Sequence, residues 1–380
     1  MIFKSKLTNV GTSIFAVMTE MANQYNAINL SQGFPDFDVN PQLIELVNQN
    51  MKKSFNQYAP MPGVFDLRKT ISDKILNLHN RFYNPESEIT IAAGATQALY
   101  TAISVLVFPG DEVIMFEPVY DSYAPSVIAN GGKPVFIKLD HKNFSIPWDE
   151  VEKRISEKTK AIILNSPHNP TGKIIVQEDL IRLENILKNN DIFLISDEVY
   201  EHIVFDSKRH ISVCESEILT KKSFVISSFG KTFHTTGWKI GYCAAPENLT
   251  KEFRKLHQFV VFAVNTPIQY AYSEYLKNPD NYLLVSSFYQ QKRDYFRDRI
   301  KNSKFRIMET EGTYFQLLDY SAISDKNDIE FSEYLTKEIG VAVIPLSPFY
   351  ISQYQSKIIR ICFAKRDEIL DKASEKLMKV

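Results

Sequence analysis

Lys231 is the residue whose type and setting could carry covalent chemistry. It lies in residues 227–232 (SSFGKT), directly after an apolar run typical of a strand. A primary amine at a strand end can condense reversibly with an aldehyde to give a Schiff base. Gly230 would let the backbone come close to a ligand. Taken alone, Lys231 could equally be a surface lysine, so its interpretation depends on the other motifs.

Residues 195–200 (ISDEVY) end a second apolar run and contain an acid and a phenol. Asp197 could keep a pyridine nitrogen protonated, so that the ring withdraws electrons from a developing carbanion. Tyr200 follows three residues later and could hydrogen-bond a phenolic oxygen of the same ring if the chain turns helical there. The alternative is a helix N-cap Asp next to a partly buried Tyr.

Residues 165–172 (NSPHNPTG) follow a third strand-like run. Two prolines and a glycine predict a stiff loop that could hold the Asn169 amide in one pose, near the phenolic oxygen and a substrate carboxylate. A purely structural turn is the alternative, because Asn-Pro is a common turn signal.

Residues 94–97 (GATQ) join a strand to a helix, and backbone amides there with the Thr96 hydroxyl could seat a phosphate. Ser228 and Lys239 could supply further phosphate donors. Thr96 could also be a plain helix cap, and Lys239 a surface cation.

Arg360 interrupts the apolar residues 358–363 (IIRICF). A guanidinium in such a setting is costly unless it meets a carboxylate. An internal Asp or Glu could serve, or the planar fork could bind a substrate carboxylate through two parallel hydrogen bonds. Together these motifs supply an amine, a ring-nitrogen acid, phenolic-oxygen donors, a phosphate seat and a carboxylate fork, which are the parts that pyridoxal phosphate (PLP) chemistry requires.

Short apolar runs alternate with helical patterns from about residue 89 to 245, and this predicts an α/β fold with a mostly parallel sheet flanked by helices. The predicted strands are Ile89–Ala93, Glu112–Phe116, Pro134–Lys138, Ala161–Asn165, Ile192–Ser196, Phe224–Ser228 and Gly241–Ala245. Ligands of such sheets bind beyond the carboxyl ends of the strands, where the motifs above lie.

The rhythm changes after residue 245. Long amphipathic helices, interrupted near Pro267, are predicted over residues 248–302. They precede strands at Phe305–Met308, Tyr314–Tyr320, Val341–Ile344 and Ile358–Phe363 and a helix near Glu330–Glu338. We therefore expect an N-terminal arm (1–40) that packs with the small domain, a large PLP-binding domain (41–284) and a small C-terminal α+β domain (285–380).

Composition excludes several classes of function. A net charge of −1 over 380 residues gives no sign of a nucleic-acid partner. Three dispersed cysteines argue against a disulfide framework and indicate buried thiols in a reducing compartment, and no histidine cluster predicts a metal. Without a signal peptide or an apolar run of membrane-spanning length, a soluble cytoplasmic protein is expected.

The chain resembles the fold-type I PLP-dependent enzymes of the class I/II aminotransferase family, close to bacterial methionine aminotransferases and kynurenine/glutamine transaminases. The resemblance runs from residues 31–37 (SQGFPDF) through 56–58 (NQY) and the motifs above to residues 236–239 (TGWK) and Arg360. It implies a ping-pong exchange of amino groups between an amino acid and a 2-oxo acid. It also implies a homodimer with shared active sites.

The resemblance assigns a role to each matching position. Lys231 would hold PLP, Asp197 its pyridine nitrogen, Asn169 and Tyr200 its phenolic oxygen, and Tyr120 would stack on its ring. The phosphate contacts would be Ala95, Thr96, Ser228 and Lys239, with Tyr58 reaching the phosphate of the neighbouring subunit. The substrate carboxylate would be held by Gly33, Asn169 and Arg360.

Departures from the family pattern bear on the substrate. The chain has Phe262-Ala263 where some kynurenine transaminases place a histidine beside an aromatic, and Thr96 where some carry a tyrosine. No second arginine of the dicarboxylate-specific enzymes is recognisable, so a neutral donor of the methionine, glutamine or aromatic type is expected. A loop at residues 345–350 (PLSPFY) would cap this pocket with aromatic surface.

Two other functions remain open from the sequence. A PLP-dependent cysteine-S-conjugate β-lyase would need the same lysine, acid and arginine. A PLP-fold effector-sensing regulator would need an attached DNA-binding domain, for which the motifs starting at Ser31 leave no room.

Overall fold

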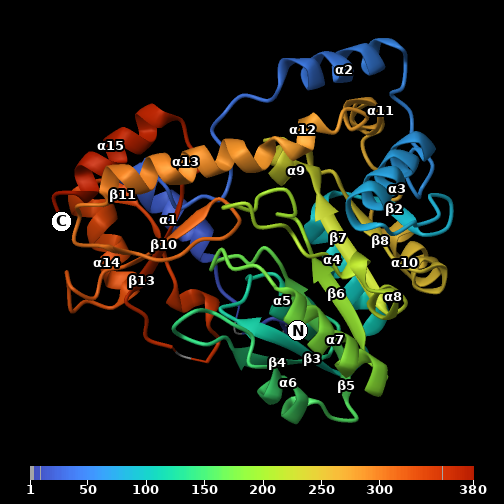
Figure 1. The fold of residues 1–380 in the computed structure, drawn as a ribbon, viewed down its shortest axis with the longest axis horizontal. Helices are drawn as coiled ribbons and strands as arrows, with labels where there is room; N and C mark the ends of the chain where they lie inside the picture. The colour runs from blue at the N-terminus through green and yellow to red at the C-terminus, as the bar shows by residue number, and fades with distance from the viewer. Residues whose placement is uncertain (1–3, 9, 353) are drawn as a thin grey trace.

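The computed structural model describes residues 4–8, 10–352 and 354–380. Its main feature is a seven-stranded sheet in the order β2-β8-β7-β6-β5-β3-β4 (Figure 1). The strands are β2 (Ile89–Ala92), β3 (Glu112–Glu117), β4 (Lys133–Lys138), β5 (Thr159–Asn165), β6 (Phe193–Asp197), β7 (Ser223–Ser228) and β8 (Gly241–Ala244). From β7 to β4 all neighbours are parallel, whereas β8 runs antiparallel to both β7 and β2. The predicted α/β class with a mostly parallel sheet is confirmed.

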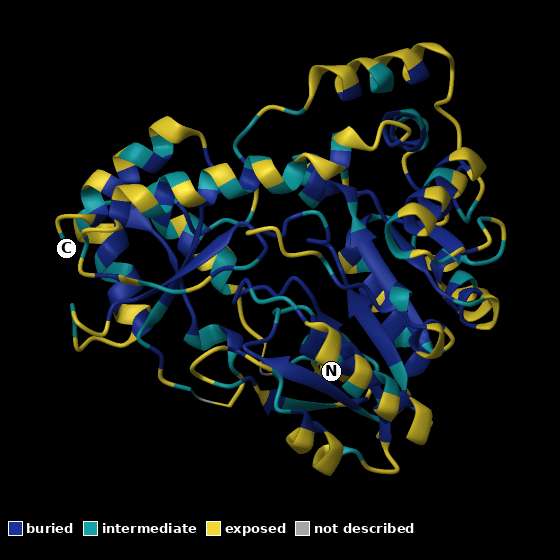
Figure 2. Ribbon diagram, viewed as in Figure 1, coloured by how far each residue is buried: buried dark blue, intermediate teal, exposed yellow. Residues whose placement is uncertain are grey.

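Both faces of this sheet are buried, which explains why its strands read as continuous apolar runs. On β3, Val113 and Met115 belong to one hydrophobic core and Ile114 and Phe116 to the other. Helix α4 (Gly94–Leu106) packs into the first core and α7 (Gln177–Asn189) into the second. Figure 2 shows the central strands buried along their length and the helices exposed on their outer sides, whereas the edge strand β4 is only partly buried.

The other α-helices lie between and after the strands, as predicted, but the region 248–302 is divided into four helices where the sequence predicts one interruption, near Pro267. They are α1 (Ile14–Gln24), α2 (Pro41–Lys52), α3 (Phe65–His79), α5 (Tyr123–Ala129), α6 (Trp148–Arg154), α8 (Glu217–Thr220), α9 (Phe229–Thr232), α10 (Glu247–Val260), α11 (Thr266–Tyr275), α12 (Asp280–Leu283), α13 (Val285–Ile300), α14 (Asp328–Tyr334) and α15 (Asp367–Leu377). Pro267 lies at the start of α11, and Pro279 directly precedes α12. Proline suits the first turn of a helix and interrupts a longer one.

A second, four-stranded sheet in the order β12-β13-β10-β9 is antiparallel throughout. Its strands are β9 (Arg306–Ile307), β10 (Phe315–Asp319), β12 (Ile344–Pro345) and β13 (Ile358–Cys362). In Figure 1 this sheet lies beside α13, α14 and α15 in the orange and red part of the chain. One hydrophobic core extends from α4 to residues of β10 and β13, so the two sheets share buried contacts.

The strand predicted at Val341–Ile344 is wrong as a single element. Residues Val341–Ala342 form β11, which pairs in parallel with β1 (Ile28–Asn29), and β12 begins at Ile344 and pairs with β13. The chain changes partner at Val343, so one ladder cannot contain the whole run. Helix α1 contacts β11 and β12, and the division of the chain at residues 40 and 284 stays a prediction.

Candidate functional site

A cavity of about 300 Å³ lies at the carboxyl ends of β6 and β7. Eleven of the twelve residues proposed from the sequence line it; they are Gly33, Ala95, Thr96, Tyr120, Asn169, Asp197, Tyr200, Ser228, Lys231, Lys239 and Arg360. The volume is at the lower end of the range for small-molecule sites. The twelfth residue, Tyr58, lies elsewhere and is 81% exposed.

Lys231 lies on α9, three residues after the end of β7. Its Nζ donates to the carbonyl of Gly33 at 3.4 Å and lies 5.8 Å from the ring centroids of both Tyr200 and Tyr314. Burial lowers the pKa of this amine to about 8, and the nearby cations Lys239 and Arg360 act in the same direction. This lower pKa makes deprotonation of the amine easier, and imine formation and proton abstraction both require the deprotonated form.

Asp197 is the last residue of β6 and is buried. The Tyr123 hydroxyl donates to its Oδ2 at 2.5 Å, and the Val199 N–H donates to its Oδ1 at 3.3 Å. Burial raises the pKa of Asp197 to about 6, although these hydrogen bonds oppose the shift. Within the described residues it forms no ion pair. A buried carboxylate without a cation fits a protonated ring nitrogen.

The helix N-cap alternative for Asp197 is wrong, because no helix begins at residues 197–200 in the described chain. Tyr200 lies instead in a turn, buried, with its ring edge-on to Tyr314 at 5.2 Å. The helical turn expected between Asp197 and Tyr200 is therefore absent, yet both side chains line the cavity.

Asn169 is fixed by contacts from two parts of the chain. Its N–H donates to Asn165 Oδ1 at 2.8 Å, and its Oδ1 accepts from Arg360 Nη1 at 2.8 Å. Asn165 Nδ2 in turn donates to the Asp197 carbonyl at 2.9 Å. With its oxygen held by Arg360, Asn169 presents its Nδ2 as a donor toward a ligand.

The N-terminus of α4 fits an anion. Its capping residue, Ala93, supplies no side-chain hydrogen bond, so the alternative role of Thr96 as a plain cap is wrong. Gly94 has φ +76°, and a Cβ there would lie 3.2 Å from Lys239 Nζ. Thr96, Ser228 and Lys239 all line the cavity. Free amides, hydroxyls and an ammonium group around a helix N-terminus are what a phosphate requires.

Arg360 lies on β13 and is almost fully buried. Besides Asn169, its Nη2 donates to the Ser31 carbonyl at 3.1 Å, and its Cζ lies 3.8 Å from the Phe315 ring centroid. Its Nε is buried without an acceptor. Burial lowers the pKa of this guanidinium to about 10. No Asp or Glu of the described chain lies within 4 Å of it, so the internal-carboxylate alternative is wrong and the fork is available to a ligand.

Three residues of the site carried no recognised signal in the sequence. Tyr123 holds Asp197, Tyr314 donates its hydroxyl to the Gly33 carbonyl at 2.6 Å, and Phe315 lies against Arg360. Tyr123 follows Tyr120 by three residues, which is the only local pattern that could have pointed to it. The contact of Tyr314 with Gly33 joins residues 281 positions apart, and that of Phe315 joins two different strands, β10 and β13, so local patterns do not report either contact.

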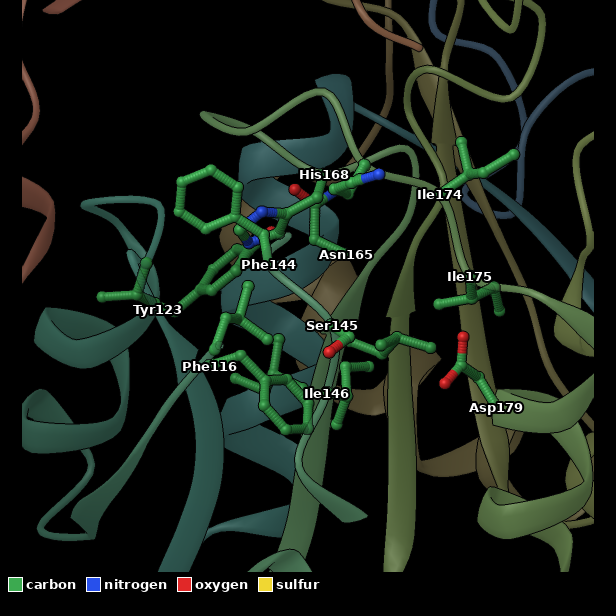
Figure 3. A pocket seen from close by; sticks show the side chains of 15 residues that line it. Phe116, Tyr123, Phe144, Ser145, Ile146, Asn165, His168, Ile174, Ile175 and Asp179 are labelled. Atoms are coloured by element: carbon green, nitrogen blue, oxygen red, sulfur yellow. The ribbon is translucent and has the colours of Figure 1, made fainter. Parts of the chain in front are cut away.

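A second, largely apolar cavity of about 50 Å³ lies behind the site. Figure 3 shows it between side chains of β3, such as Phe116, and the loop carrying Phe144 and Ile146. Tyr123 and Asn165 line both cavities. Two residues that hydrogen-bond Asp197 therefore border both cavities.

Tyr58 belongs to an exposed aromatic surface. Its ring lies edge-on to that of Phe262, with 5.1 Å between the ring centroids. Phe259, three residues before Phe262, is 85% exposed. All three cysteines are free and buried, as predicted. Over residues 4–8, 10–352 and 354–380, no helix is long and apolar enough to cross a membrane.

Comparison with known proteins gives consistent matches along the whole chain. The family model described as aminotransferase class I and II matches residues 25–377. Methionine aminotransferase from Escherichia coli is 47% identical, with 98% of this chain and 97% of that protein covered. A kynurenine–oxoglutarate transaminase from Dictyostelium discoideum is 33% identical, with 98% and 95% covered. The solved structure of YbdL from Escherichia coli, for which a methionine aminotransferase function was identified, superposes with a TM-score of 0.98 at 46% identity and full coverage of both chains.

Proposed function

The chain belongs to the class I and II aminotransferases, a family of PLP-dependent enzymes, and we propose that it transfers the amino group of a neutral amino acid to a 2-oxo acid. The observation that carries this proposal is the convergence of Lys231, Asp197 and Arg360 on one cavity. Neither the carboxylate nor the guanidinium has an ion-pair partner among the described residues. A cationic ring nitrogen and a substrate carboxylate would give each group a direct ion-pair partner.

A donor with a neutral side chain is supported by the cavity lining. Arg360 is the one arginine among the described residues that line it, and it already serves the α-carboxylate in this proposal. A second carboxylate would have no comparable fork. Phe15, Leu99 and Phe315 contribute apolar surface. The methionine aminotransferase named above points to the same class, which includes methionine, glutamine and aromatic donors.

PLP supplies an aldehyde that condenses with amines and a ring that withdraws electrons from the adjacent carbon. In our proposal the Lys231 Nζ would hold the cofactor and, once an incoming amino acid has freed it, would accept the proton of the substrate Cα as general base. Asp197 keeps the ring nitrogen protonated, and Asn169 and Tyr200 donate to the phenolic oxygen. Tyr120 stacks on the ring.

The remaining contacts in the proposal orient the two ends of the complex. Phosphate is held by the amides of Ala95 and Thr96 with the side chains of Thr96, Ser228 and Lys239. Arg360, with Asn169 and Gly33, binds the substrate carboxylate and so fixes the direction of the Cα–H bond. In a cofactor enzyme, the protein contributes to the rate mainly by holding the reacting groups in a fixed orientation among preorganised polar groups.

The proposal includes a homodimer with shared sites. Tyr58 and Phe262 are exposed large aromatics, and a partner subunit that covered them would bury apolar surface. Tyr58 would then reach the phosphate of the neighbouring site. A cytoplasmic location is also proposed, supported by three free thiols.

The test is reduction of the holoprotein with borohydride, followed by mass spectrometry of its peptides. The pyridoxyl mass is expected on the peptide that contains Lys231 and nowhere else. Lys231→Ala should retain bound cofactor without a covalent link and lose turnover, while Lys239→Ala should keep the link with weaker cofactor binding. A pyridoxyl adduct on another lysine, or substantial turnover by Lys231→Ala, would refute the assignment. A screen of amino donors against 2-oxo acceptors on the same protein then identifies the preferred pair.

A further inference from the structure

Two buried carboxylates hold the loop between β12 and β13, one near its start and one near its middle. Asp328, the first residue of α14, accepts hydrogen bonds from the Ser347 N–H at 2.6 Å and the Ser347 hydroxyl at 2.7 Å. Glu117, the last residue of β3, accepts from the N–H groups of Ile351 at 2.6 Å and Ser352 at 3.2 Å. The Ser352 hydroxyl donates to the other Glu117 oxygen at 2.6 Å. The loop is therefore tied both to the C-terminal helices and to the main sheet.

The Glu117 carboxylate receives its hydrogen bonds from this loop. Its side chain is fully buried, and within the described residues it forms no ion pair. The donors to its two oxygens all come from Ile351 and Ser352. Because a buried carboxylate is costly without hydrogen bonds, the loop and Glu117 stabilise each other in one position.

Phe349 is the side chain that this arrangement places. It is buried, and its carbonyl accepts from the Val119 N–H at 2.7 Å, two residues beyond Glu117. Its ring lies 5.8 Å from the Phe15 ring, and the Arg360 guanidinium carbon lies 5.4 Å from its centroid. Phe15 and Arg360 both line the cavity. Phe349 thus packs behind Phe15 and Arg360, two cavity-lining residues at the end where the substrate carboxylate is proposed to bind.

We propose that Glu117 is a positioning residue for substrate binding, which acts by holding residues 346–352 so that Phe349 keeps Arg360 and Phe15 in place. Glu117 does not line the cavity, so it acts through the loop and not on the reacting atoms. The inference rests on the proposed function only in taking Arg360 as the reader of the substrate carboxylate.

Loss of the Glu117 carboxylate should make residues 346–352 more mobile, and Phe349 should then hold Arg360 less firmly in place. Both the amino acid and the 2-oxo acid carry the carboxylate that Arg360 binds, so KM should rise for both, by about tenfold, if about one charge-assisted hydrogen bond is lost to misplacement. The rate at saturating substrate should change less than about twofold, because the groups that touch the reacting carbon stay in place. Cofactor content should also stay unchanged.

The experiment compares Glu117→Ala and Glu117→Gln with the matched control Glu112→Ala. Glu112 is the first residue of the same strand, and its carboxylate also accepts from a serine hydroxyl, that of Ser156, at 2.8 Å. Hydrogen exchange is measured on the holoproteins for the peptide covering residues 346–352, and KM and kcat are measured for one donor and one acceptor. In Glu117→Ala, faster exchange and raised KM values are expected, with neither in the control.

Each outcome decides one part of the inference. Unchanged exchange in Glu117→Ala overturns the role of Glu117 in holding the loop, and faster exchange with unchanged KM overturns its role in substrate binding. If the alanine variant does not fold, Glu117→Gln decides in the same way, because the amide keeps one acceptor oxygen and loses the charge. Absence of transamination by the unmodified enzyme would refute the proposed function, while the exchange measurement would still test the loop contact. Ser352→Ala should add little in the Glu117→Ala background if the two act as one unit.

Discussion

Replacing Arg360 by Lys tests whether the guanidinium binds the substrate carboxylate. Two of its five N–H donors are used inside the protein, by Asn169 and Ser31. Three remain, among them the buried Nε–H without an acceptor, and two of these suffice for a bidentate pair with a carboxylate. A lysine that kept both internal partners would have one donor left, so Arg360→Lys removes one charge-assisted hydrogen bond to the substrate.

The structure sets the expected size of this effect. A hydrogen bond to a charged group contributes about 1.5–3 kcal/mol, and a tenfold change in affinity corresponds to about 1.4 kcal/mol. The KM values for the amino donor and for the 2-oxo acceptor should therefore each rise by about 10- to 150-fold. Loss of the planar contact with Phe315, 3.8 Å from the guanidinium carbon, acts in the same direction.

The assay measures steady-state transamination with saturating and limiting concentrations of each substrate. A primary amine with the same side chain as the donor but without the carboxylate serves as the control. Its slow half-reaction, followed by the absorbance of the cofactor, should be nearly unaffected by Arg360→Lys. An equal loss for the amine, or unchanged KM values for the two acids, would show that Arg360 serves the protein's own structure instead of the substrate.

Two further predictions concern buried hydrogen bonds and buried histidines. Tyr123→Phe removes the 2.5 Å hydrogen bond to Asp197, so the pKa of Asp197 should rise above about 6. We expect kcat to fall at least about tenfold and the acid limb of the pH–rate profile to move to higher pH. A pH–rate profile identical to that of the unmodified enzyme would contradict this. Burial lowers the pKa of His168 to about 4, so this side chain stays neutral in the folded protein, whereas in the unfolded chain it takes up a proton near pH 6.5. The contribution of His168 to stability is therefore complete above about pH 6.5 and is lost as the pH falls toward 4. Urea unfolding at pH 7 and pH 4.5 should show a smaller loss of unfolding free energy in His168→Gln than in the unmodified protein, and equal losses would argue against it.

The strand ends explain why much of the site could be predicted from the sequence. Asn165, Asp197 and Ser228 each end a parallel strand, and β5, β6 and β7 are neighbours in the sheet. Parallel strands bring their carboxyl ends to one edge, so motifs after three separate apolar runs had to meet. The nearly continuous burial of these strands also made their bounds predictable to within two residues.

The parts that sequence could not give are those set by contacts across the fold. Nothing in the pattern around Arg360 distinguishes an internal acid from a substrate as its partner, and the absence of an acid near it is a property of the packed molecule. Tyr123 reaches Asp197 across 74 positions of the chain. The change of partner at Val343, from β1 to β13, depends on where α1 and β13 lie and not on the residues of the run itself.

The charges of the site share one physical feature, which links its architecture to its function. Burial moves the pKa of Asp197 up to about 6, that of Lys231 down to about 8 and that of Arg360 down to about 10, each toward the uncharged form. Hydrogen bonds with neutral groups offset part of these desolvation costs: Tyr123 donates to Asp197, and Asn169 accepts from Arg360. The charges of Asp197 and Lys231 also act on each other and oppose the two shifts. A ligand that brings a cationic ring nitrogen to Asp197 and an anionic carboxylate to Arg360 gives each of them a direct ion-pair partner, in surroundings where an ion pair is worth more than in water. Selectivity for a cofactor–substrate pair of this kind follows from the same burial that shifts the pKa values of Asp197 and Arg360.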